Sequence, residues 1–261
     1  MKKLKLGIVG CGFLADIIVD AWRDGLLEEF EFAGCLSRNS ESAERLANKA
    51  GCVACASLDE LLAMKPDYVI EAASPAALKA IAEPVLSHGA NLVVLSIGAF
   101  ADSDFYDRIR QAAARTGTRV HLASGAIGGF DVLRTAALMS SIEASISTQK
   151  GPASLRGTPV FSERLMTDRE SSEVFSGSAK DAIALFPTKV NVAVACALAT
   201  AGAERTGVRV HSVPGFKGDD HRLEVAGEEV RVVVDIYSKT SAIAGWSVVA
   251  LLRNLVSPIV F

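Results

Sequence analysis

The sequence has no long apolar run and no targeting pattern. No apolar segment reaches the ~18 residues of a membrane-spanning helix without a glycine or a polar residue. Met1-Lys2-Lys3 leads directly into a strand pattern that stops at glycine, so the start of the chain does not resemble a signal peptide. We therefore expect a cytoplasmic protein that does not associate with membranes.

Strong charge and paired cysteines are also lacking. A net charge of −3 leaves no basic footprint for nucleic acid. The five cysteines are scattered and odd in number, which argues against a disulfide framework. Cys52 and Cys55 have CxxC spacing, but no second pair or histidine accompanies them. We interpret them as small apolar side chains near a strand rather than as a redox pair, and we expect no metal site.

The chain does contain the pattern of an α/β protein. Half of its 261 residues are hydrophobic, which suits one large or two small domains. Up to residue 122, short apolar runs alternate with helical segments, and this predicts a doubly wound parallel sheet of the Rossmann type. The expected strands are 4–9, 31–36, 68–72, 91–95 and 119–122, and the expected helices are 13–26, 40–50, 58–64, 75–88 and 102–116.

The composition changes after residue 122. Residues 123–236 predict a second, sheet-containing α+β domain, with helices at 131–139 and 193–203. Serine-, threonine- and valine-rich segments predict its strands. Residues 208–214 and the segment from His221 to Tyr237 read as antiparallel strands, and the latter segment turns at Gly227-Glu228. The apolar tail predicts a helix, and we expect residues 237–261 to pack back on domain 1–122.

The loop after the first strand has the spacing of a dinucleotide-binding turn. Gly10-Cys11-Gly12-Phe13-Leu14-Ala15 fits GxGxxA, with a strand before it and a helix after it. Gly10 permits the tight turn, Gly12 lets the backbone approach a pyrophosphate, and Ala15 permits close helix–strand packing. A glycine turn without a ligand has the same residues, but the surrounding elements favour dinucleotide binding.

The end of the second strand bears on the choice between NAD and NADP. An Asp or Glu that binds the ribose is expected here, but the chain has Ser37-Arg38-Asn39. A carboxylate would repel a 2′-phosphate, whereas a hydroxyl and a bidentate guanidinium would bind it. Ser37 and Arg38 therefore favour NADP, or at least its use beside NAD. The alternative is that Arg38 is simply an exposed loop residue.

Four histidines are candidates for acid–base chemistry. His88 is expected to cap a helix or face solvent, and His121 to be a core histidine. Strand alternation points His211 outward and His221 toward the covered face of its sheet. Asp219-Asp220 precedes His221, and a nearby carboxylate would raise the pKa of the imidazole. On spacing alone, His221 is equally consistent with a buried structural role and a catalytic one.

Two further segments could contact a ligand. Asn191 stands at the start of a helix of small residues, where it suits an N-cap, and its amide could equally bind a nicotinamide or a substrate. Residues 124–129, SGAIGG, contain too much glycine for a helix interior. They can bring backbone N–H groups close to a ligand.

Taken together, several segments resemble the L-aspartate dehydrogenase family. They occur in the family's order and extend over both expected domains. The matching segments are GIVGCGFLA (7–15), EAASPAAL (71–78), LSIGAF (95–100), ASGAIGGFD (123–131), RGTP (156–159), the run from Phe175 to Gly202, HRLEVAG (221–227) and KTSAIA (239–244).

The resemblance implies NAD(P)-dependent oxidation of L-aspartate to iminoaspartate, reversible by reductive amination of oxaloacetate with ammonia. It also implies that the second, α+β domain serves substrate binding and dimerisation, that the protein is a homodimer and, for some members, that it has a role in pyridine nucleotide biosynthesis. By motif, Ala126 and Asn191 contact the cofactor and His221 is the active-site residue. We also expect cofactor contacts from Phe13, Leu14, Ala73 and Ser74. The candidates that bind the two substrate carboxylates are Lys189, Lys239, Thr240, Ser241 and the amides of 124–129.

Two departures from the family pattern affect specificity. The family often has Asp-Arg where this chain has Ser37-Arg38, which argues against strict use of NAD. Ser238 stands where the family tends to have proline, in a segment shorter than usual, so we expect a different rim of the substrate pocket. Two other functions fit the same pattern: a different NAD(P)-dependent amino- or oxo-acid oxidoreductase, and an NADP-binding sensor without catalysis.

Overall fold

The computed structural model describes residues 2–186 and 190–260, which form two compact units. Unit 1 comprises residues up to Gly125 together with Ala244–Phe261, and unit 2 comprises Ala126–Ile243. Both divisions fall later in the chain than the sequence predicts. In particular, the expected boundary at residue 236 lies inside a strand that continues to Ser238.

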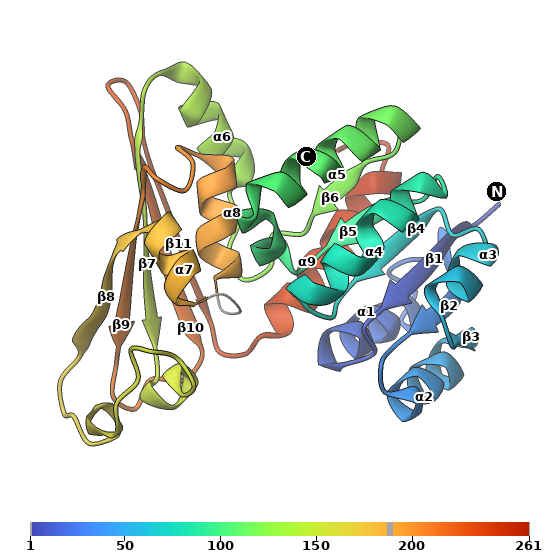
Figure 1. Ribbon diagram of the computed structural model, residues 1–261, viewed down its shortest axis with the longest axis horizontal. Helices are drawn as coiled ribbons and strands as arrows, with labels where there is room; N and C mark the ends of the chain where they lie inside the picture. The colour runs from blue at the N-terminus through green and yellow to red at the C-terminus, as the bar shows by residue number, and fades with distance from the viewer. Residues whose placement is uncertain (1, 187–189, 261) are drawn as a thin grey trace. The chain divides into compact units, whose positions relative to one another are not determined.

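Unit 1 is built on a six-stranded parallel sheet with the order β3-β2-β1-β4-β5-β6 (Figure 1). This order is that of dinucleotide-binding folds, with the switch point between β1 and β4. The strands are β1 (Leu4–Val9), β2 (Phe30–Leu36), β3 (Val53–Cys55), β4 (Tyr68–Glu71), β5 (Asn91–Val94) and β6 (Val120–Leu122).

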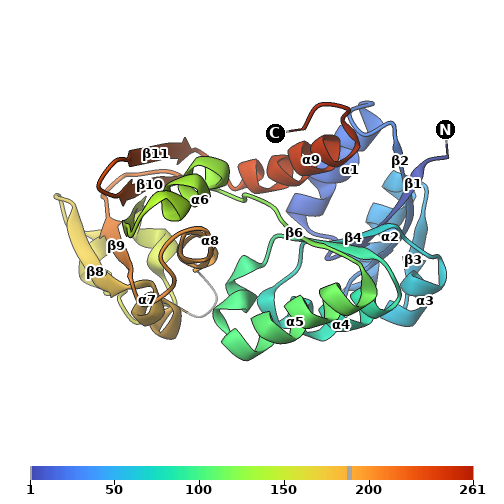
Figure 2. The ribbon, with the colours of Figure 1, turned by 90° about the horizontal axis from the view of Figure 1, so that it is seen from above.

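Helices cover both faces of this sheet, α4 and α5 on one side and α1 with α9 on the other (Figure 2). The predicted doubly wound fold is therefore confirmed. The helices are α1 (Phe13–Arg23), α2 (Ser40–Ala50), α3 (Leu58–Ala63), α4 (Pro75–Ser87), α5 (Ser103–Thr116) and α9 (Ala242–Val256), and a 3-10 turn, η1, covers Ile97–Ala101.

The carboxy-terminal helix α9 packs into the core of unit 1. Val248, Val249 and Leu252 are buried in the same hydrophobic cluster as residues of β1, α1 and α2. Gly245 lies so close to Ile17 of α1 that an added Cβ would be 3.0 Å from the Cβ of Ile17. Among the described residues, no helix has both the length and the apolar character to cross a bilayer.

Unit 2 contains a five-stranded mixed sheet, with α6, α7 and α8 on one of its faces (Figure 1). The strand order is β11-β10-β7-β9-β8. The strands are β7 (Glu143–Lys150), β8 (Ser172–Ser178), β9 (Thr206–Ser212), β10 (Asp219–Ala226) and β11 (Arg231–Ser238). The helices are α6 (Phe130–Met139), α7 (Ala179–Leu185) and α8 (Asn191–Ala199), and 3-10 turns η2 and η3 cover Pro152–Leu155 and Glu163–Met166.

The predicted antiparallel pair β10–β11 is confirmed, but β9 differs from the expectation. It does not join that pair antiparallel; it pairs parallel with β7, which separates it from β10. The chain between β7 and β9 contains β8, α7 and α8, long enough for the crossover that a parallel pair needs. Two strands, β3 and β8, were not predicted from the sequence, because β3 has only three residues and β8 is rich in serine.

Candidate functional site

The loop after β1 has the backbone geometry of a phosphate-binding turn. Gly10 has φ +98°, and an added Cβ would lie 2.5 Å from the carbonyl oxygen of Ala72, so only glycine fits there. Gly12 precedes α1 in an extended conformation, and within the described residues no atom lies within 4 Å of where its Cβ would be. Ala15 is fully buried, as close helix–strand packing requires.

The start of α1 is suited to an anion. No described side chain caps this helix, so its first N–H groups point toward the open space beside Gly12. Phe13 is 58% exposed next to that space, and Leu14 is half-buried. The loop therefore fits the pyrophosphate of a dinucleotide, which would lie where a side chain at position 12 would otherwise be.

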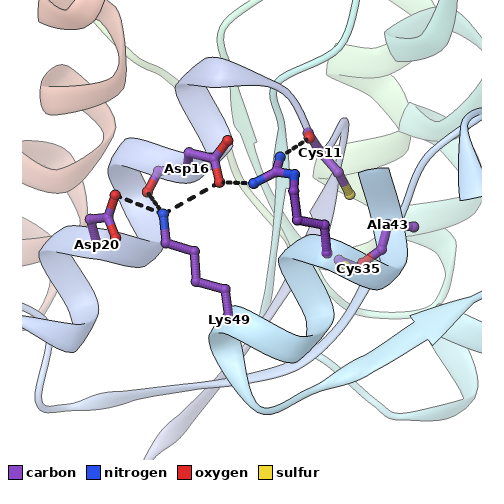
Figure 3. Close-up of polar contacts among 7 residues, drawn as sticks. Cys11, Asp16, Asp20, Cys35, Ala43 and Lys49 are labelled. Carbon is purple, nitrogen blue, oxygen red and sulfur yellow. Dashed lines mark hydrogen bonds and ion pairs between the residues drawn. The ribbon is translucent and has the colours of Figure 1, made fainter. Parts of the chain in front are cut away.

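Ion pairs hold the phosphate loop and α1 against α2 (Figure 3). One guanidinium nitrogen of Arg45 lies 2.6 Å from Asp16, and the other donates to the backbone oxygen of Cys11 at 3.1 Å. Lys49 bridges Asp16 and Asp20. Burial alone would raise the pKa of Asp16, but the hydrogen bond and charge of Arg45, with Lys49, lower it. Asp16 therefore stays ionised and keeps the loop in place.

The tip of β2 presents no carboxylate. Ser37 is half-buried and accepts a hydrogen bond from the backbone N–H of Asn39 at 3.3 Å. Asn39 is the N-cap of α2, because its side chain accepts from the N–H of Ser42 at 3.0 Å. Arg38 is exposed, and no acidic group of the described residues forms an ion pair with it. Its guanidinium is therefore available to a phosphate.

The loop after β4 lies directly against the phosphate loop. Ala73 has its Cβ 2.8 Å from the position of an added Gly10 Cβ, and Ser74 caps α4 by accepting from the N–H of Ala77. The sequence did not predict a role for one residue at this edge of the sheet. Glu71 is fully buried and accepts hydrogen bonds from the backbone N–H groups of both Ala73 and Ser74.

Residues 124–129 form an irregular turn, as their glycine content predicts. Gly125 and Gly129 both have positive φ, and Gly129 precedes α6. Ala126 is half-buried and is the first residue of unit 2. Asn191 is exposed and is the first residue of α8, whose N-cap is Val190, so the prediction that Asn191 caps this helix is wrong.

His221 lies on the covered face of the second sheet, as strand alternation predicts. It is 2% exposed, and its neighbours on the same face, Leu223 and Val225, are fully buried. Its Nδ1 lies 3.0 Å from Oγ1 of Thr148, its register partner on β7. Two residues along β7, Lys150 forms an ion pair with Asp219.

The pKa of His221 shifts in the direction opposite to the prediction. Burial and the positive charge of Lys150 lower the pKa of His221 from 6.5 to about 4, although Asp219 opposes the shift. The sequence indicated a raised pKa because aspartates precede this histidine. The cost of burying an imidazolium exceeds that effect, and Lys150 neutralises the nearer carboxylate. His221 is therefore a neutral imidazole at physiological pH.

A cavity of about 40 Å³ lies beside the partners of His221 in unit 2. Thr148 and Lys150 line it together with Ser154 and Thr158, and its other walls are mostly apolar. Thr148 and Lys150 were not predicted from the sequence. Alternation along β7 places them on one face, but only the register with β10 brings them to His221.

Replacing Lys150 by methionine should raise the pKa of His221 above its value of about 4. The substitution removes the cation that disfavours the imidazolium and frees Asp219 to stabilise it. A pH titration of the His221 ring by NMR measures the shift. Lys180→Met, which removes an exposed lysine paired with Glu204, is the matched control and should change nothing. An unchanged His221 titration in Lys150→Met would contradict the electrostatic account.

The remaining substrate candidates are less well placed by the structure. Lys189 lies outside the described residues. Lys239, Thr240 and Ser241 are exposed in the turn between β11 and α9. This turn follows Ser238, the register partner of Asp219, so it lies at the end of β10 that carries His221.

The other histidines have structural positions. His88 is exposed at the end of α4, its Nδ1 2.9 Å from the Pro84 oxygen, as predicted. His121 is half-buried on β6 near the ring of Tyr68, and burial lowers its pKa. His211 lies 3.9 Å from Glu173 of the neighbouring strand. All five cysteines are free, and the described residues contain no cluster suited to a metal ion.

The fold and the two sets of residues define a two-domain dehydrogenase that uses a pyridine nucleotide. Unit 1 has the strand order and the open glycine loop of a dinucleotide-binding domain, and unit 2 has a buried neutral histidine whose neighbours Thr148 and Lys150 line a small cavity.

Comparison with known proteins gives the family. The model "Homoserine dehydrogenase, NAD binding domain" matches residues 10–123, and "Aspartate dehydrogenase, C-terminal" matches residues 131–255. The L-aspartate dehydrogenases of Methanococcus maripaludis and Methanosarcina acetivorans are 31% and 32% identical to this chain, over 98% of each sequence. The chain belongs to the L-aspartate dehydrogenase family.

Solved structures agree with this result. Aspartate dehydrogenase from Thermotoga maritima matches with a TM-score of 0.78 and 26% identity, over 99% of both chains. Biliverdin reductase from Synechocystis, with a TM-score of 0.52 and 16% identity, shares only the fold.

Proposed function

We propose that this protein oxidises L-aspartate to iminoaspartate with NADP or NAD, and catalyses the reverse reductive amination of oxaloacetate with ammonia. The observation that carries the proposal is the buried, neutral His221, held by Thr148 in a chain that matches L-aspartate dehydrogenases over 98% of its length. A base that is neutral at physiological pH suits removal of a proton from the substrate nitrogen.

The first contribution of the chain is to bind and orient the cofactor. A bound nicotinamide supplies the hydride acceptor at its C4 atom. Gly10 and Gly12 shape the loop for the pyrophosphate, the N–H groups of Phe13 and Leu14 would donate to it, and Ser37 and Arg38 would bind the adenosine ribose and its 2′-phosphate. Ala73, Ser74, Ala126 and Asn191 are proposed to contact the nicotinamide half.

The second contribution is acid–base chemistry at the substrate nitrogen. In the tautomer that carries hydrogen on Nδ1, His221 donates to Thr148 Oγ1 and presents the lone pair of Nε2. Nε2 accepts a proton as the amine becomes an imine. In the reverse direction, protonated His221 donates to the leaving oxygen of a carbinolamine. A dianionic substrate raises the pKa of His221 on binding and thereby favours this protonated form.

The substrate carboxylates require donors close to His221. Lys150, on β7, is the register partner of Asp219 and so lies near the end of β10 that carries His221. Lys239, Thr240 and Ser241 follow β11 at that end. We propose these groups, with Lys189, as candidates for the two carboxylates. Competing functions are another amino- or oxo-acid oxidoreductase and an NADP sensor. A screen of L-amino acids at fixed cofactor decides among them. Turnover restricted to aspartate supports the proposal, and turnover of another acid supports a different amino- or oxo-acid oxidoreductase. Cofactor binding without turnover supports an NADP sensor.

The biological setting is also a proposal. All five cysteines are unpaired, as is usual in the reducing cytoplasm. Iminoaspartate made there could be used for pyridine nucleotide biosynthesis, and the family resemblance suggests a homodimer, which the particle mass in solution would test.

NADP should be used at least as well as NAD. Ser37 stands where a carboxylate would exclude a 2′-phosphate. The guanidinium of Arg38, which forms no ion pair with the described acidic residues, can bind that phosphate. The measurement is kcat/KM for each cofactor. Ser37→Asp should shift the preference toward NAD, and Arg38→Ala should weaken NADP while leaving NAD nearly unchanged. A wild-type preference for NAD above ~100-fold, worth about 2.7 kcal/mol, would contradict the argument.

A further inference from the structure

The carboxylate of Glu71 links two loops at the carboxyl edge of the parallel sheet. Its Oε1 accepts from the N–H of Ala73 at 2.8 Å, the N–H of Ser74 at 2.9 Å and the hydroxyl of Ser96 at 2.8 Å. Its Oε2 accepts from the N–H of Ser96 at 3.0 Å. Ala73 and Ser74 follow β4, and Ser96 follows β5, so one side chain fixes both connections.

This carboxylate is costly to bury. Glu71 is 0% exposed, and none of the described basic side chains forms an ion pair with it. Burial raises its pKa, and the backbone and hydroxyl donors of Ala73, Ser96 and Ser74 oppose that shift. A buried charge balanced only by hydrogen bonds adds little net stability, but it fixes the geometry of every group that donates to it.

The loops that Glu71 fixes lie where a cofactor binds. Ligands of open parallel sheets bind at the carboxyl ends of the strands at the switch point, here between β1 and β4. The loop after β4 is in direct contact with the phosphate loop, because an added Cβ at Gly10 would lie 2.5 Å from Ala72 O and 2.8 Å from the Cβ of Ala73. A movement of residues 72–74 would therefore change the wall of the cofactor site.

We propose that Glu71 is a positioning residue for the nicotinamide half of the dinucleotide. The β1–β3 half of such a fold binds the adenosine side, with the ribose at the end of the second strand, so β4–β6 serve the nicotinamide side. The carboxylate of Glu71 holds the loops after β4 and β5 in the conformation that accepts that half. This inference rests on the proposed cofactor binding.

The test compares a whole dinucleotide with its adenosine half. Glu71→Gln keeps the size of the side chain but turns an NH₂ group toward N–H donors. We expect its Kd for NADPH, measured by fluorescence titration, to rise at least tenfold, while its Kd for 2′,5′-ADP stays within twofold of wild type. Ser96→Ala, which removes one of the four donors, should raise the Kd for NADPH about two- to fourfold. Glu31→Gln, at an exposed glutamate of β2, is the control and should change neither.

The outcomes separate this inference from the proposed function. Unchanged NADPH binding in folded Glu71→Gln overturns the positioning role, and an equal loss of both ligands shows a general structural role and overturns it too. If Glu71→Gln does not fold, Ser96→Ala decides: weaker NADPH binding with normal 2′,5′-ADP binding supports the inference, and normal NADPH binding overturns it. A wild-type protein that binds no dinucleotide would overturn the proposed function itself.

Discussion

Replacing His221 by alanine is expected to lower kcat by roughly 10²–10⁴-fold, the usual contribution of a general acid–base group. Its imidazole is buried, is held by Thr148 and is neutral at physiological pH, so its removal takes away the proposed proton acceptor for the substrate nitrogen. The Kd for NADPH should stay close to wild type, because the phosphate loop belongs to the other unit. The measurement is kcat per active site at saturating cofactor and substrate.

Two controls separate catalysis from stability. His211→Ala alters a histidine on the outward side of β9 and should leave kcat nearly unchanged. If His221 were only a core residue, His221→Ala would lower the melting temperature and leave normal turnover in the folded fraction. Near-normal kcat in folded His221→Ala would end the catalytic assignment.

Replacing Gly12 by valine should abolish dinucleotide binding without unfolding the protein. Gly12 has φ −94°, which any residue adopts, and its Cβ position is clear of all described atoms to 4 Å. The branched side chain would instead occupy the space proposed for the pyrophosphate. Fluorescence titration with NADPH gives the affinity, and the melting temperature should stay within a few degrees of wild type.

A second pair of variants makes this result specific. Gly12→Ala, with a smaller side chain, should weaken binding less than valine does. Gly10→Ala should instead lower stability, because its Cβ would meet Ala72 O at 2.5 Å and its φ is +98°. Normal NADPH binding by folded Gly12→Val would show that the cofactor does not bind at this loop.

The sequence predicts the first unit better than the second for a physical reason. The apolar runs of β1 and β5 are buried on both faces and are bounded by glycine or helical segments, so local pattern identifies them. In unit 2, β8 has few apolar residues, and β9 lies beside β7 only through a crossover that local pattern does not reveal. The parallel pairing could therefore not be predicted.

In the candidate site, too, local features were predicted from the sequence and contacts between distant residues were not. Alternation along β10 predicts that His221 faces inward, and the GxGxxA spacing predicts the loop at Gly10 and Gly12. The environment of His221 depends on Lys150, 71 residues earlier in the chain, and the role of Glu71 depends on Ser96, 25 residues later. Both contacts arise from strand register, which a single sequence does not specify.

The most direct test of the account is NAD(P)H oxidation in the presence of oxaloacetate and ammonia, followed at 340 nm. We expect oxidation that requires all three components, that does not proceed with oxaloacetate alone, and that yields L-aspartate in an amount equal to the NAD(P)H consumed. Tight NADPH binding with no oxidation, or oxidation that is independent of ammonia, would contradict the assignment as an L-aspartate dehydrogenase.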